Sequence, residues 1–202
     1  MQEQLFSVLK RYCLPGFVVA ISFIYQLTPL NNLLDFERTE IRNGQWWLLV
    51  TGHFCHLSWT HWLLNNVALV IIWELFYRAT PIIKASTELL LLCLCVSAGI
   101  FWFNSDVEWY VGLSGVLHGL FTIGVLREIF LGHKLSIVIG IVLVGKLVWE
   151  QTVGITTSFF FNPDEVLVDA HLYGAVGGLV IAAAYHAFDV VTGGNKLSEP
   201  SP

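Results

Sequence analysis

Charged residues are scarce in this sequence of 202 residues, at 12% of the chain against about 25% in an ordinary soluble domain. The mean hydropathy is +0.68, so a soluble globule could hardly cover itself with polar side chains. The net charge of −5 leaves no basic face for phosphates, which excludes nucleic acid as a partner. The sequence also lacks CxxC, CxxCH and HExxH motifs, which excludes zinc-type proteases and indicates that its four cysteines are core residues.

The same scarcity leaves long uncharged stretches whose lengths suit membrane-spanning helices, which need about 20 mostly apolar residues. Six stretches qualify, the fifth if Lys146 is tolerated: residues 12–34, 43–73, 89–105, 109–126, 135–149 and 170–188. We therefore predict an all-α membrane protein with six transmembrane helices. The first stretch lacks the small-residue cleavage site of a signal peptide. The predicted domains are an N-terminal segment (1–11), a membrane domain (12–188) and a flexible tail (189–202).

Lysines and arginines predict the orientation, because they concentrate in cytoplasmic loops. Seven of them fall on the side of the two termini, whereas Arg38 and Arg42 fall on the other side. Both termini are therefore predicted to be cytoplasmic. The opposite, outer loops are acidic and contain Asp35, Glu37, Glu40, Asp106, Glu108, Asp164 and Glu165.

Polar side chains inside predicted spans are functional candidates, because burying them in lipid is costly. They gather at the outer starts of the second, fourth and sixth spans: His56, His61 and Asn65, then Ser114, then Asp169 and His171. Ser114 and His171 each follow the last outer acidic residue by six positions, which at the helical rise places both about 9 Å deep. A serine and a histidine are thus expected at the same depth.

This pair predicts nucleophilic catalysis, since a serine hydroxyl needs a base within hydrogen-bond reach. The two helices must approach closely, and small residues permit this: Gly115 with Gly119, and Gly174 with Gly178. An oxyanion also needs donors. The i, i+4 pair His61 and Asn65, following Ser58 as a predicted N-cap, and the backbone N–H of Ser114 are the candidates, while His56 is expected to fix the loop above them.

Three motifs in this order resemble the signature elements of rhomboid intramembrane serine proteases: His56-x4-His61-x3-Asn65, Gly112-Leu113-Ser114-Gly115 and Ala170-His171-x2-Gly174-x3-Gly178. The resemblance covers about residues 12–188 and implies a six-helix rhomboid-like bundle. It also implies a Ser–His dyad without a catalytic aspartate, cofactor or metal. The implied roles are Ser114 and His171 as the dyad, and His61, Asn65 and the Ser114 N–H as the oxyanion hole.

Within the family, the segments GQWWLLVTGHFCHLSWTHWLLNN and GLSGVLHGLF look most like rhombosortases. This resemblance implies a bacterial inner-membrane enzyme with its active site open to the periplasm. Its substrates would be secreted proteins with a C-terminal anchor made of Gly-Gly, an apolar helix and a basic tail. Two positions depart from the family pattern. The Trp-Arg pair of the first outer loop is Trp47-Leu48, and the aromatic residue that stacks on the catalytic histidine is His118, which could modulate the dyad or act as a rival base.

Other interpretations remain open from the sequence. The seven histidines could ligate haem or a metal, or the chain could be a non-catalytic rhomboid-like protein that binds transmembrane helices. His53 and His186 are taken as interfacial or structural, and Asp169 as orienting a backbone or loop. Gly193-Gly194 indicates a flexible tail.

Overall fold

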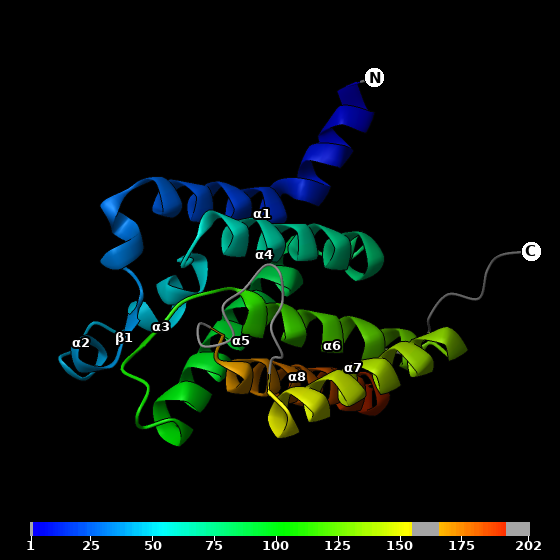
Figure 1. Cartoon of the computed structure of the whole chain (residues 1–202). Coiled ribbons are helices and arrows are strands. Elements are labelled where there is room, and N and C mark those ends of the chain that lie inside the picture. The colour runs from blue at the N-terminus through cyan, green and yellow to red at the C-terminus, as the bar shows by residue number, and fades with distance from the viewer. Residues whose placement is uncertain (1, 155–165, 193–202) are drawn as a thin grey trace, which may run out of the picture.

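The computed structural model describes residues 2–154 and 166–192, and these residues are mostly helical. Six long helices lie side by side in one bundle (Figure 1): α1 (Gln2–Leu27), α4 (Trp59–Ile72), α5 (Ile82–Phe103), α6 (Ser114–Phe130), α7 (Lys134–Thr152) and α8 (Val168–Thr192). Pro15 lies inside α1, whose first turns project away from the bundle in Figure 1, as expected where a proline removes a backbone hydrogen bond. The predicted helical class is confirmed.

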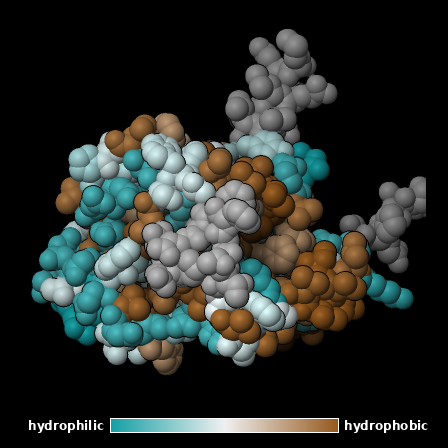
Figure 2. Space-filling model, in the orientation of Figure 1, coloured by the Kyte–Doolittle hydropathy of each residue, from teal (hydrophilic) through white to brown (hydrophobic). Residues whose placement is uncertain are grey.

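Three of these helices, α5, α7 and α8, are long and apolar enough to cross a membrane, and Arg11–Leu27 of α1 is a shorter apolar segment. In Figure 2 hydrophobic side chains cover α7, whereas hydrophilic ones gather over the opposite end of the bundle. We name this hydrophilic end, which carries α2 (Arg38–Arg42), β1 (Phe36–Glu37) and β2 (Trp109–Tyr110), the sheet end. These features support a multi-pass membrane protein.

Several predicted spans differ from the helices in their bounds: α1 is Gln2–Leu27 where 12–34 was predicted, and the second and third spans begin elsewhere. The uncharged stretch 43–73 contains the short helices α3 (Leu48–Thr51) and η2 (Gly52–Phe54), and α4 begins only at Trp59. Its N-cap is Ser58, as predicted, with Oγ accepting the His61 N–H at 3.2 Å. In the other case, α5 begins at Ile82 instead of 89, because Glu88 is paired with Arg127 at 2.9 Å inside the bundle.

The predicted depth of Ser114 also needs correction. It assumed six helical residues after Glu108, but β2 occupies Trp109–Tyr110 and α6 begins at Ser114 itself. The matching count for His171 started at Glu165, which lies outside the described residues. Ser114 and His171 nevertheless lie near the starts of α6 and α8, both at the sheet end (Figure 1).

Arg38 anchors the loop that connects α1 to α4. Its guanidinium is buried at 1% exposure and donates to four backbone carbonyls at and after the end of α5, those of Ile100, Phe101, Asn104 and Val107. The antiparallel pairing of β1 with β2 continues this attachment towards α6. The residue after Trp47 is Leu48, which is buried in the core, so in this chain Arg38 supplies the anchor.

Helices α6 and α8 pack backbone against backbone. A Cβ atom on Gly115 would lie 2.7 Å from the Ala170 carbonyl oxygen, and one on Gly119 would lie 2.8 Å from that of Gly174. From the other side, a Cβ on Gly178 would lie 2.5 Å from the Gly119 oxygen, and one on Gly174 would collide with that of Gly115. Such an approach leaves no room for side chains between the two helices.

Candidate active site

Ser114 is held at a tight turn between β2 and α6. Gly112 has φ +117°, a conformation that favours glycine, and a Cβ there would lie 2.7 Å from the His61 ring. The turn is fixed on both sides, because the Tyr110 hydroxyl donates to the Gly112 carbonyl at 2.9 Å and the Gly112 N–H donates to that of Gly52 at 3.3 Å. Ser114 is the first residue of α6 and is partly exposed.

His171 lies within hydrogen-bond distance of this serine. Its Nε2 atom is 3.0 Å from Ser114 Oγ, and its side chain is buried at 5% exposure in the first turns of α8. The glycine contacts between α6 and α8 set this distance, because Gly115 and Ala170, the neighbours of the two residues, are the ones in contact. A neutral imidazole at this distance can take the hydroxyl proton.

The structure places His61 and Asn65 on one buried face of α4. The His61 ring lies against Gly112 and makes an edge contact with His56 at 5.1 Å between centroids. The Asn65 side chain is buried at 5% exposure, and its Nδ2 donor has no hydrogen-bond partner among the residues that the structure describes. A buried amide donor without a partner is costly, and oxyanion holes use donors of this kind.

His56 precedes α4, and its backbone is held in place by Asn31. The His56 N–H donates to Asn31 Oδ1, and Asn31 Nδ2 donates to the His56 carbonyl, both at 2.9 Å. The side chain of Asn31, in the short helix η1 (Pro29–Asn32), thereby holds the start of α4 in place. His56 therefore lies where the sequence placed it, in the loop next to His61.

His118 stacks on His171, with 4.1 Å between the ring centroids and 17° between the planes. Its Nδ1 is 2.8 Å from the Ser114 carbonyl oxygen and its Nε2 is 2.9 Å from Lys146 Nζ. Because both ring nitrogens bond to groups other than Ser114 Oγ, this arrangement does not support His118 as a rival base. Its position is that of an aromatic platform for His171.

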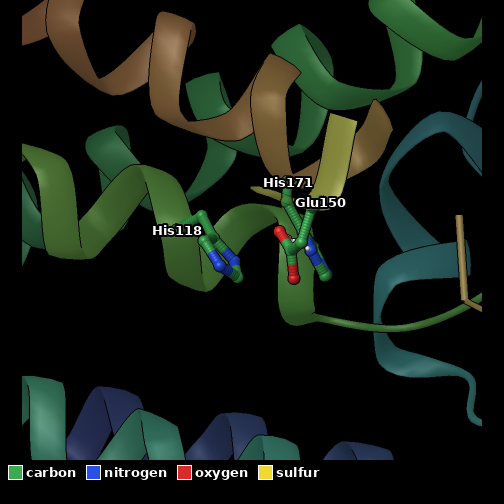
Figure 3. Close-up of side chains that lie close together, drawn as sticks. All are labelled: His118, Glu150 and His171. Carbon is green, nitrogen blue, oxygen red and sulfur yellow. Dashed lines mark hydrogen bonds and ion pairs between the residues drawn. The ribbon is translucent and has the colours of Figure 1, made fainter. Parts of the chain in front are cut away.

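Glu150 is a site residue that was not predicted from the sequence. Its Oε2 is 3.1 Å from His171 Nδ1, and its Oε1 accepts from Lys146 Nζ at 2.6 Å. His118, Glu150 and His171 converge from α6, α7 and α8 (Figure 3). A signal was present in the sequence, since Lys146 and Glu150 are an i, i+4 pair of opposite charges in an otherwise apolar helix. The predicted span stopped at residue 149 because Glu150 was taken as its polar boundary.

One atom each from His118, Glu150 and His171 could ligate a metal ion, since these atoms lie within 4.8 Å of one another. The ammonium group of Lys146 already contacts two of these residues. A cation supplied by the chain itself therefore lies beside these potential ligands, which weakens the metal interpretation of the histidines.

The remaining polar candidates have structural partners. Asp169 accepts from Asn104 Nδ2 at 2.6 Å, and the Tyr173 hydroxyl donates to Asn104 Oδ1 at 2.7 Å, which ties α8 to the end of α5. His53 is buried, with Nε2 3.0 Å from Ser97 Oγ. His186 stacks on Phe130. Gly193-Gly194 lies outside the described residues.

Comparison with known proteins places the chain in a family. Residues 43–188 match the Rhomboid domain. A protein of Bacillus subtilis (strain 168) named "Putative rhomboid protease YdcA" is 22% identical over 199 residues, which cover 89% of this chain and 92% of that protein. The matched region contains each of the residues placed around Ser114.

Proposed function

The chain belongs to the rhomboid family, and membership of this family suggests intramembrane protease activity. We propose that the protein is an intramembrane serine protease with Ser114 as nucleophile and His171 as general base. The observation that carries this proposal is the 3.0 Å distance between His171 Nε2 and Ser114 Oγ. The packing of α6 on α8 through glycines supports it, since this packing brings the N-terminal ends of the two helices together.

In the proposed reaction, Ser114 Oγ forms a bond to the carbonyl carbon of the scissile peptide while its proton passes to His171 Nε2. His171 then gives this proton to the amide nitrogen as the C–N bond breaks, which releases the amine and leaves an acyl-enzyme on Ser114. Water completes hydrolysis in the same way. It loses a proton to His171, its oxygen bonds to the acyl carbon, and Ser114 Oγ departs and recovers the proton.

The proposed oxyanion hole consists of the Ser114 backbone N–H with the His61 and Asn65 side chains. Its support is the buried Asn65 Nδ2 donor described above and the position of the His61 ring against Gly112, two residues before the nucleophile. Charge that develops on the carbonyl oxygen in the transition state would satisfy the Asn65 donor. Gly112, Gly115, Gly174 and Gly178 support the site by allowing the close approaches, and His56 and His118 by packing on its histidines.

We propose six membrane crossings with both termini in the cytoplasm, in the inner membrane of a bacterium, and the active site towards the outer, periplasmic face. The excess of lysines and arginines on the side of the membrane that carries both termini supports this orientation. The proposed domain boundaries at residues 11/12 and 188/189 fall inside α1 and α8, which are continuous helices at those positions. Periplasmic reporter fusions should be active after residue 44 and inactive after residue 80, and the reverse pattern would contradict this orientation.

The proposed substrates are membrane-anchored proteins, in particular those with the C-terminal Gly-Gly, apolar and basic signal of rhombosortase substrates. A segment that reaches Ser114 must leave its own helix, because a helix hides its carbonyls in hydrogen bonds. Glycine weakens a helix by about 1 kcal/mol relative to alanine. A co-expressed secreted reporter with such an anchor should be shortened, and replacing its glycines by leucines should suppress cleavage.

The test of the chemistry is a fluorophosphonate probe on the detergent-solubilised protein, beside the same reporter assay. Ser114→Ala and His171→Ala should each remove nearly all labelling and cleavage, and the double variant should be little worse, because residues that act as a unit are not additive. Ser105→Ala, which changes a serine in the turn after α5, is the matched control. Full cleavage by Ser114→Ala would contradict the protease proposal.

A further inference from the structure

Glu150 is placed against the side of His171 that does not face the serine. Its carboxylate is largely buried, with the residue 8% exposed, and its two oxygens contact different partners. Oε2 is 3.1 Å from His171 Nδ1, and Oε1 is 2.6 Å from the ammonium of Lys146. An acidic side chain buried in a membrane protein is costly unless it is paired, and such residues are functional candidates by default.

The hydrogen-bond donors and acceptors of this cluster fit one consistent arrangement. Lys146 can only donate, so the His118 Nε2 atom that it contacts accepts, and His118 Nδ1 carries a proton that it donates to the Ser114 carbonyl. His171 must accept the Ser114 hydroxyl proton at Nε2, so its own proton is on Nδ1 and is donated to Glu150. The chain of bonds begins at the Ser114 hydroxyl and ends at the Ser114 carbonyl.

We propose that Glu150 is a positioning residue that, with Ser114 and His171, forms a Ser–His–Glu triad held in place by Lys146. The carboxylate keeps the proton of His171 on Nδ1, so that Nε2 is available to Ser114 Oγ. When His171 takes the serine proton, both of its nitrogens carry protons, and the adjacent carboxylate stabilises the imidazolium without itself becoming protonated. This inference rests on the proposed function, since it requires Ser114 and His171 to be the reacting pair.

Lys146 has a separate task in this arrangement. Its side chain is 45% exposed whereas that of Glu150 is 10% exposed, so Lys146 pairs the buried carboxylate from the more exposed side. By bonding to Glu150 Oε1 and to His118 Nε2, it fixes both the acid behind His171 and the ring stacked on it. Loss of Lys146 should therefore loosen both supports of the base at once.

A structural role alone would account for less of the geometry. The buried apolar contact between α7 and the bundle consists of a small separate cluster of Leu143, Leu147 and Ala175, so a polar pair could help to attach α7. Attachment alone does not require that the carboxylate face Nδ1 of the residue whose Nε2 faces Ser114. The test must therefore follow the chemistry of His171 apart from the stability of the fold.

The experiment compares Glu150→Gln, Glu150→Asp and Lys146→Met with Glu128→Gln, a control that removes a carboxylate at the far end of α6. Glutamine keeps the size of the side chain but can offer an N–H to Nδ1, which favours the wrong tautomer. We expect Glu150→Gln to lower kcat and the fluorophosphonate labelling rate by about 10²–10⁴-fold with little change in KM. Glu150→Asp, which retains the charge, should recover about tenfold or more of that loss.

A proton NMR measurement follows the hydrogen bond directly. A low-field resonance of His171 Nδ1–H should be present in the wild type and in Ser114→Ala, and absent from Glu150→Gln and His171→Ala. If the resonance is present but Ser114→Ala remains active, the proposed function fails while the Glu150 contact stands. Wild-type kcat and labelling by folded Glu150→Gln would overturn the triad, and if that variant does not fold, absence of the resonance from Ser114→Ala would overturn it instead.

Discussion

Replacing Gly115 by alanine should separate the nucleophile from its base. The new Cβ would lie 2.7 Å from the Ala170 carbonyl oxygen, and ordinary contacts begin at 3.4 Å, so α6 and α8 must part by about 0.7 Å. The position of a Cβ is fixed by the backbone of α6, and the carbonyl oxygen belongs to the backbone of α8, so no side-chain rotation can relieve this contact. Because Gly115 and Ala170 adjoin Ser114 and His171, the same displacement would stretch their 3.0 Å contact to about 3.7 Å, beyond hydrogen-bond range.

Gly115→Ala should lower both the rate and the stability. A displacement of about 1 Å at a reacting group can cost about 10²-fold in rate, so kcat and the labelling rate should fall by about 10- to 100-fold. Overpacking of a tight interface costs about 1–3 kcal/mol, which should lower the thermal midpoint but leave the protein folded at the assay temperature.

The assay is fluorophosphonate labelling per mole of folded, monodisperse protein in detergent, together with a thermal melt. Gly16→Ala is the matched control, because a Cβ at this position in α1 meets nothing within 4 Å. It should label at the wild-type rate. Wild-type labelling by Gly115→Ala at an unchanged thermal midpoint would refute the reasoning, since it would mean that this glycine contact does not set the distance between Ser114 and His171.

Three further outcomes are expected. Asn65→Ala should lower kcat by up to about 10²–10³-fold at nearly constant KM, and an unchanged kcat in the reporter assay would assign Asn65 to helix packing. Arg38→Met should cost about 3 kcal/mol or more, because four carbonyls lose a charged donor, whereas the exposed Arg42→Met should melt like the wild type; equal melting of the two variants would contradict the anchoring role. Lys146→Met should become about tenfold more sensitive to inhibition by zinc than the wild type, since it exposes potential ligands on His118, Glu150 and His171, and equal sensitivity in a zinc titration would argue against a cation site there.

The features that could be predicted from the sequence are those that depend on residues close together in one helix. Gly174 and Gly178 mark a face of α8, and His171 lies on that face, so the approach to Ser114 could be expected from helical spacing alone. The N-cap at Ser58 is similarly local, because its partner is the N–H of His61 three residues later.

The features that were missed depend on partners far away in the chain. The Arg38 carbonyl partners follow it by 62 to 69 residues, and Glu150 bonds to a histidine 21 residues later. In a sequence, a charged residue indicates the end of a membrane span. The free-energy cost of burying that residue, however, depends on the partner with which it pairs in the folded structure. The stretch 43–73 was wrongly predicted as one span because it contains no charged residue. Its first part is instead a connecting segment held by backbone hydrogen bonds.

The anchoring of the sheet end through Arg38 has a consequence for how freely its partners can vary between related sequences. All four acceptors of the guanidinium are main-chain carbonyls, which are present whatever side chains occupy those positions. As far as this contact is concerned, the side chains at Ile100, Phe101, Asn104 and Val107 can be exchanged without removing an acceptor, provided that the backbone after α5 keeps its course. The attachment of this loop therefore depends on the identity of a single residue, Arg38, and on the backbone of its partners.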